Sequence, residues 1–268
     1  MGSRLGQHFL TTRAPAVALA RAADIRKGEP VLEIGPGKGA LTGMLLAFGA
    51  KVIAIEKDAE LVAILTEKFA HEIAWGQLEV INTDIREVDP GAYGLTKGHY
   101  TIAANIPYYI TGEIIRSFLT AQAQPHTMAL LIQKEVAQRI VSTKESILSL
   151  SVKAYGSPRI VLKVSRKEFS PPPEVDSAVL AIGNISRDFF GDMSESAFFE
   201  VVKTGFASKR KFLANNLAQR FGKETVHYAF AKCSIEEKAR AETIPLEKWK
   251  HLTQELLALE ATENSPSS

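Results

Sequence analysis

The first third of the chain contains a strand–glycine–helix–strand unit, and no other feature limits the fold as strongly. The apolar run Pro30–Ile34 predicts a short strand, followed by the glycine turn Gly35-Pro36-Gly37-Lys38-Gly39 and an amphipathic helix that ends near Phe48. Glycines here let the backbone approach a ligand at the helix N-terminus. A second buried strand at Lys51–Ile55 ends at Glu56, where an acidic side chain reaches ribose hydroxyls. The unit predicts a parallel α/β sheet with a nucleoside cofactor at the glycine turn.

The spacing alone does not distinguish a dinucleotide from S-adenosylmethionine. Two details favour S-adenosylmethionine. Glu33 lies just before the first glycine, close to where a methionine amine or a sulfonium would carry its positive charge. The third glycine of the dinucleotide pattern is also displaced.

Five more runs complete the predicted sheet: Leu78–Ile81, Tyr100–Ala104, Met128–Ile132, Arg159–Ser165 and Ala178–Ile182. Helical patterns separate the earlier runs, which is typical of parallel strands, whereas no helix separates the last two. We therefore expect those two to form an antiparallel hairpin at the sheet edge. The predicted fold class is α/β, with a Rossmann-like sheet of seven strands whose last strand is antiparallel.

A change in composition at Gly183–Ser196, which is rich in Gly, Asn, Ser and Asp, marks the expected linker between two domains. Residues 1–183 are expected to form the cofactor-binding domain and residues 184–260 a small all-helical domain. Its last helices are predicted near Glu236–Ala241 and Pro245–Leu259. The polar end of the chain, residues 261–268, is expected to be a disordered tail.

The motif Asn105-Ile106-Pro107-Tyr108 suits a flat ring that carries an amino group. It follows the predicted strand Tyr100–Ala104, at the edge of the sheet where ligands bind. The Asn105 side-chain oxygen and the Ile106 carbonyl can each accept a hydrogen bond from an exocyclic amino group, and Tyr108 offers a stacking face. Asn and Pro are also common in turns, so an ordinary strand-to-loop turn is the alternative.

Three other places are candidates for ligand contacts. Asp84, beyond the strand Leu78–Ile81, is placed to accept from an adenine amino group or to cap the next segment. Phe169 precedes a proline run that stiffens its loop, so it is a second stacking face or a buried side chain. The segment Gly6-Gln7-His8-Phe9-Leu10 folds over a ligand or packs against the first helix.

The composition does not by itself indicate a polyanionic partner. Lys+Arg 32 against Asp+Glu 30 gives a formal net charge of +2, so a nucleic-acid surface must come from local clustering. One such cluster lies in the helical domain beside Phe206 and Phe212, and a solvated helix end is the alternative explanation for it. Its cations are Lys203, Lys209, Arg210 and Lys211.

Cysteine content and hydropathy limit the class of protein further. The single cysteine, Cys233, excludes an internal disulfide framework and Cys-rich zinc sites, and we expect no metal centre. No apolar run approaches the roughly 18 residues of a membrane span. Met1–Leu10 also lacks the apolar core of a signal peptide. We therefore expect a cytoplasmic protein without a membrane partner.

Taken together, the motifs resemble those of the ribosomal RNA adenine dimethyltransferase family, the KsgA-type enzymes, over nearly the whole chain. The resemblance includes the Phe169–Val179 and Lys209–Leu217 segments. It implies an S-adenosylmethionine-dependent methyltransferase fold with a small helical, RNA-binding C-terminal domain. It also implies N6,N6-dimethylation of two adjacent adenosines in a hairpin loop near the 3′ end of small-subunit (16S) rRNA. The expected partner is that rRNA in an immature 30S particle during ribosome biogenesis, and the protein is expected to be a monomer.

The resemblance also implies roles for individual residues. His8 stands where the family usually has Asn, and an imidazole offers one acceptor at most. The expected cofactor contacts are His8, Leu10, Gly35, Gly37, Glu56, Asp84 and Asn105. The expected catalytic and base-binding residues are Asn105, Ile106, Pro107, Tyr108 and Phe169, and the expected RNA-binding residues are Lys203, Lys209, Arg210 and Lys211.

Three alternatives to this function stay open. One is methylation of a different adenine, in large-subunit rRNA as in resistance methyltransferases, or in DNA. Another is an RNA-binding assembly factor that keeps the fold without turnover. A nicotinamide dehydrogenase is disfavoured because no acid/base pair for hydride chemistry is evident.

Overall fold

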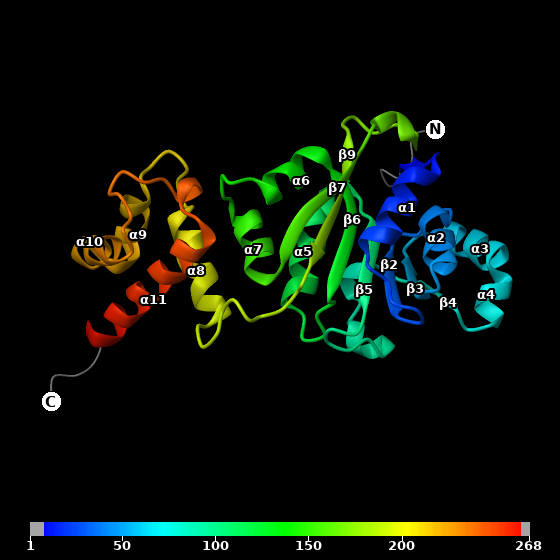
Figure 1. Ribbon diagram of the computed structural model, residues 1–268, viewed down its shortest axis with the longest axis horizontal. Helices are drawn as coiled ribbons and strands as arrows, with labels where there is room; N and C mark the ends of the chain where they lie inside the picture. Colours follow the sequence, from blue (N-terminus) through cyan, green and yellow to red (C-terminus); the bar gives the residue numbers. More distant parts are fainter. Residues whose placement is uncertain (1–7, 264–268) are drawn as a thin grey trace. The chain divides into compact units, whose positions relative to one another are not determined.

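The computed structural model describes residues 8–263 (Figure 1). They form two compact units. The first runs to Gln138 and includes Gly156–Ser186, and the second contains Arg139–Tyr155 and the chain from Arg187 onward. The linker region predicted at Gly183–Ser196 includes this last boundary, but residues 139–155, expected in the first domain, group with the C-terminal helices.

A seven-stranded sheet with the order β4-β3-β2-β5-β6-β9-β7 organises the first unit. Strands β4 to β6 in this order are parallel, β9 is antiparallel to β6, and β7 is antiparallel to β9 at the sheet edge. The predicted fold class and edge hairpin are confirmed. The strands are β2 (Pro30–Ile34), β3 (Lys51–Glu56), β4 (Leu78–Asn82), β5 (Thr101–Asn105), β6 (Thr127–Gln133), β7 (Ser157–Val164) and β9 (Ser177–Gly183).

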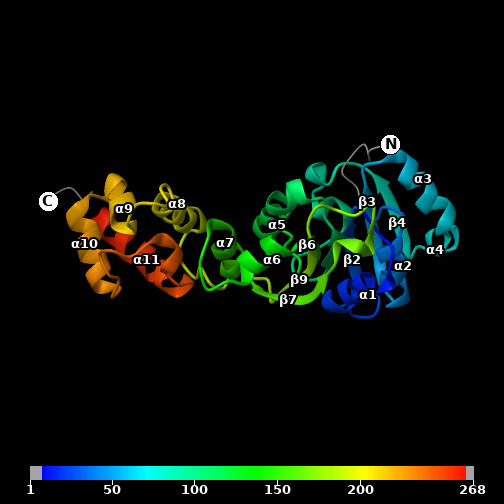
Figure 2. The same cartoon turned by 90° about the horizontal axis from the view of Figure 1, so that it is seen from above.

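The central strands are uninterrupted apolar runs because both faces of the sheet are covered. Val31 and Ala103 pack with Leu19 of α1 and Leu45 of α2 in one core cluster, and these two helices lie on the same side of the sheet (Figure 2). Alternate strand residues such as Ile102 are also fully buried. The helices of this unit are α1 (Arg13–Ala22), α2 (Ala40–Ala47), α3 (Ala59–Lys68), α4 (Ala70–Ala74), α5 (Thr111–Thr120) and most of α6 (Lys134–Val141), and short 3-10 turns lie at Ile85–Glu87, Pro90–Tyr93, Tyr108–Ile110 and Arg166–Glu168.

A second, two-stranded sheet was not predicted. Strand β1 (Phe9–Leu10) pairs antiparallel with β8 (Phe169–Ser170), so that Leu10 lies opposite Phe169. The Thr11 N–H also donates to the Glu168 carbonyl over 2.9 Å. This pairing fixes the N-terminal segment, His8–Leu10, against the proline loop that precedes β9.

The second unit is helical. Its core contains Phe198, Leu217, Phe230 and Trp249, all almost fully buried. A Cβ on Gly205 would lie 2.5 Å from the Trp249 ring, so only glycine allows helices α8 and α11 to approach this closely. The helices are α7 (Ile147–Tyr155), α8 (Glu195–Gly205), α9 (Leu213–Phe221), α10 (Lys223–Lys232) and α11 (Leu246–Glu263).

Two predictions for this unit are wrong. Glu236–Ala241 is not a helix but a turn that leads into a 3-10 turn at Ala241–Thr243. The Ala239 carbonyl there accepts the Leu213 N–H at the start of α9, so a tertiary contact sets the backbone. Helix α11 continues to Glu263, so residues 261–263 do not belong to a disordered tail, and residues 264–268 lie outside the described residues.

Candidate active site

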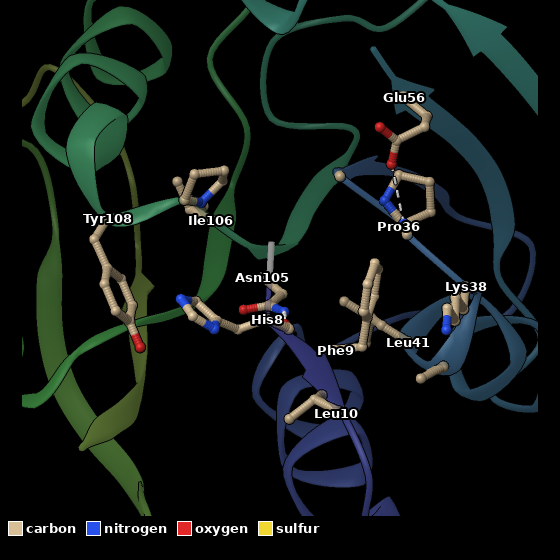
Figure 3. Close-up of a pocket in the computed structure, with 14 residues that line it drawn as sticks. His8, Phe9, Leu10, Pro36, Lys38, Leu41, Glu56, Asn105, Ile106 and Tyr108 are labelled. Atoms are coloured by element: carbon tan, nitrogen blue, oxygen red, sulfur yellow. Dashed lines mark hydrogen bonds between the residues drawn. The ribbon is translucent and has the colours of Figure 1, made fainter. Parts of the chain in front are cut away.

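A pocket opens at the carboxyl ends of β2, β3 and β5, next to the N-terminal segment (Figure 3). Ligands bind at this edge of parallel sheets because loops from neighbouring strands diverge there. The pocket brings together most of the predicted cofactor-binding and catalytic residues. It is lined by His8, Phe9, Leu10, Gly35, Pro36, Gly37, Lys38, Ala40, Leu41, Glu56, Asn105, Ile106, Pro107 and Tyr108.

The glycine turn forms one side of this pocket. Gly35 and Gly37 have φ values of +65° and +58°, which side chains rarely adopt. A Cβ on Gly37 would also lie 3.1 Å from the Phe9 ring. Glu56 braces the turn, because its Oε2 accepts the Gly37 N–H over 3.1 Å and its Oε1 accepts the Asp58 N–H over 3.0 Å. The turn therefore presents bare backbone to the pocket, with one carboxylate beside it.

Glu33 lies in β2 just before the turn and is fully buried. Within the described residues, neither carboxylate oxygen has a hydrogen-bond partner. Burial raises the pKa of Glu33 to about 8; nearby Thr42 opposes this rise and the charge of Glu56 adds to it. Glu33 itself does not line the pocket that contains Gly35 and Glu56.

The hydrogen bonds of Asn105 fix the direction of its amide. Its Nδ2 lies 3.1 Å from the His8 carbonyl, which can only accept, so the amino group must face His8. The Oδ1 acceptor is then left for the pocket. Among the described residues, no donor is found for the neighbouring Ile106 carbonyl. The side chain of Tyr108 also lines the pocket, and its hydroxyl lies 2.8 Å from Ser177 Oγ. Burial raises the pKa of Tyr108, so the phenol is neutral at neutral pH.

The N-terminal segment closes another side of the pocket. The His8 ring approaches the proline loop, with Nδ1 2.8 Å from the Pro171 carbonyl. Phe9 packs against the glycine turn, and Lys38 Nζ lies 4.8 Å from the centre of its ring. The prediction that this segment folds over a ligand agrees with its place in the pocket lining, while Gly6 and Gln7 lie outside the described residues.

Phe169 is not placed as a stacking face. Its side chain is only 4% exposed and packs in the core with Val164 and Val179. It does not line the pocket that contains Asn105. The prediction failed because pairing with Leu10 in the small sheet turns Phe169 inward, and this pairing has no signal in the local sequence.

Asp84 also stands apart from this pocket. Its Oδ2 pairs with Lys57 Nζ at 2.9 Å and with the Arg86 guanidinium at 2.6 Å, and its Oδ1 accepts the Arg86 N–H. The Arg86 guanidinium is the main cause that holds the pKa of Asp84 well below its usual range. The capping role considered for Asp84 is thus present, and its contact with adenine stays a prediction.

The predicted RNA-binding cations lie in the second unit and are all exposed. Lys209, Arg210 and Lys211 form a basic loop between α8 and α9, and Asn216 Nδ2 fixes this loop by donating to the Gly205 and Ser208 carbonyls. Lys203 lies in the last turn of α8. Phe212 is 39% exposed, whereas Phe206 stacks on Trp249. No ion pair to these four cations is found within residues 8–263.

The described residues contain neither a metal-binding cluster nor a membrane-spanning helix. No group of three or more His, Cys, Asp or Glu side chains suited to a metal ion occurs between residues 8 and 263. In the same part of the chain, no helix has the length and apolar content that a membrane crossing requires.

Comparison with known proteins assigns the family. The profile described as "Ribosomal RNA adenine dimethylase" matches residues 2–257. The chain belongs to the ribosomal RNA adenine dimethylase family. "Ribosomal RNA small subunit methyltransferase A" of Dehalococcoides mccartyi is 39% identical over 97% of this chain and 88% of its own length. The protein of the same name from Clostridium botulinum is 35% identical over 93% and 91%.

Solved structures of two other proteins have the same fold. The 23S rRNA methyltransferase ErmE has a TM-score of 0.75 and 27% identity, over 92% of this chain and 99% of its own. A dimethyladenosine transferase from Plasmodium falciparum has a TM-score of 0.77 and 22% identity, over 96% and 98%, which supports the fold alone. The chain is thus a methyltransferase with the fold of rRNA-modifying enzymes.

Several pocket residues of this dimethylase were not assigned individual roles from the sequence, although Phe9, Pro36 and Lys38 lie within predicted ligand-binding segments. They are Phe9, Pro36, Lys38, Ala40 and Leu41, together with Ser177, the partner of Tyr108. The four from Pro36 to Leu41 share the glycine turn and the first turn of α2, so their position beside Gly37 was an available signal. Ser177 lies 69 residues from Tyr108, and only the sheet brings them together.

Proposed function

We propose that this methyltransferase uses S-adenosylmethionine to dimethylate N6 of two adjacent adenosines in a hairpin loop near the 3′ end of small-subunit rRNA. The observation that carries the proposal is the pair of acceptors at the pocket, Asn105 Oδ1 and the Ile106 carbonyl. An adenine N6 amino group has two hydrogens to donate, so the pair complements it. The names of the relatives from D. mccartyi and C. botulinum support the small subunit as the source of the RNA.

The residues present fit the proposed cofactor. Gly35 and Gly37 present backbone without a Cβ to the pocket, and Glu56 offers a carboxylate for ribose hydroxyls. The buried Glu33, two residues before Gly35, offers a carboxyl without a hydrogen-bond partner among the described residues, behind the pocket lining. His8, Leu10 and Asn105 complete the proposed contacts to the cofactor. Asp84 is proposed to accept a hydrogen bond from the adenine amino group of the cofactor. When bound, S-adenosylmethionine supplies an electrophilic methyl group on a positively charged sulfur.

The chain's own contribution to the reaction is orientation. The adenine N6 lone pair is delocalised into the ring, which makes it a poor nucleophile. Acceptance of both N6 hydrogens by Asn105 Oδ1 and the Ile106 carbonyl favours a tetrahedral nitrogen with its lone pair directed along one line. Pro107 fixes the backbone that follows the Ile106 carbonyl, which helps to hold this acceptor in place. The proton lost from N6 passes to water after transfer, and no side-chain base is required.

Recognition of the RNA combines a flipped base with phosphate contacts. The target adenine must leave its stack to enter the pocket, where Tyr108 offers an aromatic face. Lys203, Lys209, Arg210 and Lys211 are proposed to contact phosphates, because exposed cations without acidic partners release counterions when they bind RNA. The proposed setting is an immature 30S particle in the cytoplasm, with the enzyme acting as a monomer.

The direct test is incubation of the protein with radiolabelled S-adenosylmethionine and immature small subunits that lack the modification, followed by mapping of the label. Label on N6 of two adjacent adenosines near the 3′ end of the rRNA is the expected result. Large-subunit particles form the parallel arm, because the similarity to ErmE makes 23S rRNA the second candidate substrate. Label in the large-subunit arm alone contradicts the proposed substrate, and no label in either arm favours a non-catalytic assembly factor.

A further inference from the structure

Two aromatic rings face each other in the pocket. The imidazole of His8 and the phenol ring of Tyr108 have centroids 6.2 Å apart and planes only 26° from parallel (Figure 3). Both residues line the pocket, on the side of Asn105 away from the glycine turn. Centroids of paired aromatic rings lie about 4.5–7 Å apart, so the 6.2 Å of this pair is at the wide end of that range and the two rings are not in tight face-to-face contact.

Each ring is held at its polar end. His8 Nδ1 lies 2.8 Å from the Pro171 carbonyl, and since that oxygen can only accept, the proton of a neutral imidazole sits on Nδ1. The Tyr108 hydroxyl lies 2.8 Å from Ser177 Oγ. The backbone of His8 is fixed as well, because its carbonyl accepts Asn105 Nδ2. The two faces are therefore positioned by contacts to different segments of the chain.

A base can enter between the two rings after a small movement of their side chains. A planar ring between two aromatic faces needs about 7 Å between them, twice a stacking contact of about 3.5 Å. The ring centroids are 6.2 Å apart with planes 26° from parallel, so the rings must move apart and become more parallel, which rotation about the side-chain torsions of either residue supplies. A base in this gap lies next to Asn105 and Ile106, which carry the two acceptors.

We propose that His8 and Tyr108 enclose the target adenine between their rings, so that the His8 ring serves the base and any cofactor contact of His8 is made by its main chain, which the variants retain. This inference rests on the proposed function, since it takes adenine as the ligand. Phe169, the other aromatic candidate for the second face, is buried in the core. His8 thus replaces it as the partner of Tyr108.

The first test compares three variants of His8 in methyl transfer to small subunits. His8→Ala and His8→Asn remove the aromatic face and are expected to lower kcat/KM for RNA roughly 5- to 100-fold, the range for loss of one base-stacking contact. His8→Phe keeps the face without the Pro171 hydrogen bond and is expected to recover most of that loss. His71→Ala is the matched control, because His71 stacks on Trp75 at 5.0 Å outside the pocket.

A second measurement separates the base from the cofactor. Calorimetry with S-adenosylhomocysteine is expected to give His8→Asn a dissociation constant within about twofold of wild type, because the lost contact is to the base. A hairpin RNA with 2-aminopurine at the target position gives a readout independent of activity. Stacking quenches its fluorescence in the wild type, and the signal is expected to rise in His8→Asn and Tyr108→Ala but not in His8→Phe.

The two proposals fail in different ways. If wild-type protein methylates adenine and His8→Ala matches it in both kcat/KM and 2-aminopurine quenching, this inference is overturned while the proposed function stands. A His8→Asn variant that loses cofactor affinity tenfold with unchanged quenching also overturns it, because His8 would then be a cofactor contact. If the wild type methylates no RNA, the proposed function fails, and quenching that depends on both rings still supports an adenine site.

Discussion

The polar groups proposed for the chemistry and those proposed for RNA binding are held in opposite ways. At the pocket of the first unit, Glu56 accepts two backbone N–H groups, and Asn105 is oriented by the His8 carbonyl. In the second unit, Lys209, Arg210 and Lys211 are exposed, and no ion pair to them is found within residues 8–263. Groups with fixed positions stabilise the transition state of a reaction, whereas exposed cations attract the distributed negative charge of RNA phosphates. Substitutions in the two units should therefore change different measured quantities.

The largest effect is expected for Asn105→Ala. The variant loses one of the two N6 acceptors and the bond that orients His8, so kcat should fall roughly 100- to 1000-fold, as when one donor is lost from an oxyanion hole. Single-turnover methyl transfer at saturating RNA and cofactor measures this. Asn82→Ala is the matched control, since Asn82 Nδ2 also donates to backbone carbonyls at a strand end but does not line the pocket.

An equal loss in both variants would mean that Asn105 acts through general stability. Melting temperatures of the two proteins supply that comparison. A fall in kcat that occurs only in Asn105→Ala would show that Asn105 contributes to the methyl-transfer step itself.

Glu56→Gln should have the next largest effect. The Gln amide has only one acceptor oxygen, and its NH2 group cannot accept from the N–H of Gly37 or Asp58. The glycine turn therefore loses one of these two hydrogen bonds. We expect cofactor affinity to fall about tenfold or more by calorimetry, equivalent to roughly one charge-assisted hydrogen bond. Unchanged affinity would contradict a role of Glu56 in cofactor binding, whether through the turn or through the ribose hydroxyls.

The basic loop should respond to salt instead. Replacing Lys209, Arg210 and Lys211 with Gln is expected to reduce the slope of log K for RNA against log salt by about 2 to 3, and to leave kcat at saturating RNA nearly unchanged. Replacement of Lys27, Lys51 and Lys97 is the matched control, since it removes the same charge from exposed positions near the amino ends of the strands. Equal salt slopes for the two triple variants would show that the basic loop is a solvated surface without specific phosphate contacts.

The last prediction concerns stability and not binding or catalysis. The pKa of Glu33 is raised to about 8 in the folded state, from the ordinary value of 4.5, so the folded state binds more protons than the unfolded state between these values. Stability should then fall as pH rises from about 4.5 to about 8. Glu33→Gln removes this pH dependence. The melting temperature of the variant relative to that of the wild type should therefore rise between pH 6 and pH 9. A constant difference across that range would contradict a neutral, buried Glu33.

The sequence predicted those parts of the site that are contiguous in the chain. Gly35–Gly39, Glu56 and Asn105–Tyr108 each follow an apolar strand, and the parallel order of β3, β2 and β5 brings them to one edge. Phe169 and the proline loop could not be placed, because His8 and Pro171 are 163 residues apart and meet through β1 and β8. The orientation of His8 toward Tyr108 depends on that same long-range contact.

The central claim is that Asn105 Oδ1 and the Ile106 carbonyl hold an adenine amino group. The most direct measurement is a crystal structure of the protein with S-adenosylhomocysteine and an adenosine-containing oligonucleotide. The account predicts the N6 atom about 3 Å from both oxygens, with the base beside Tyr108. An amino group that binds elsewhere while these two oxygens face water would contradict it.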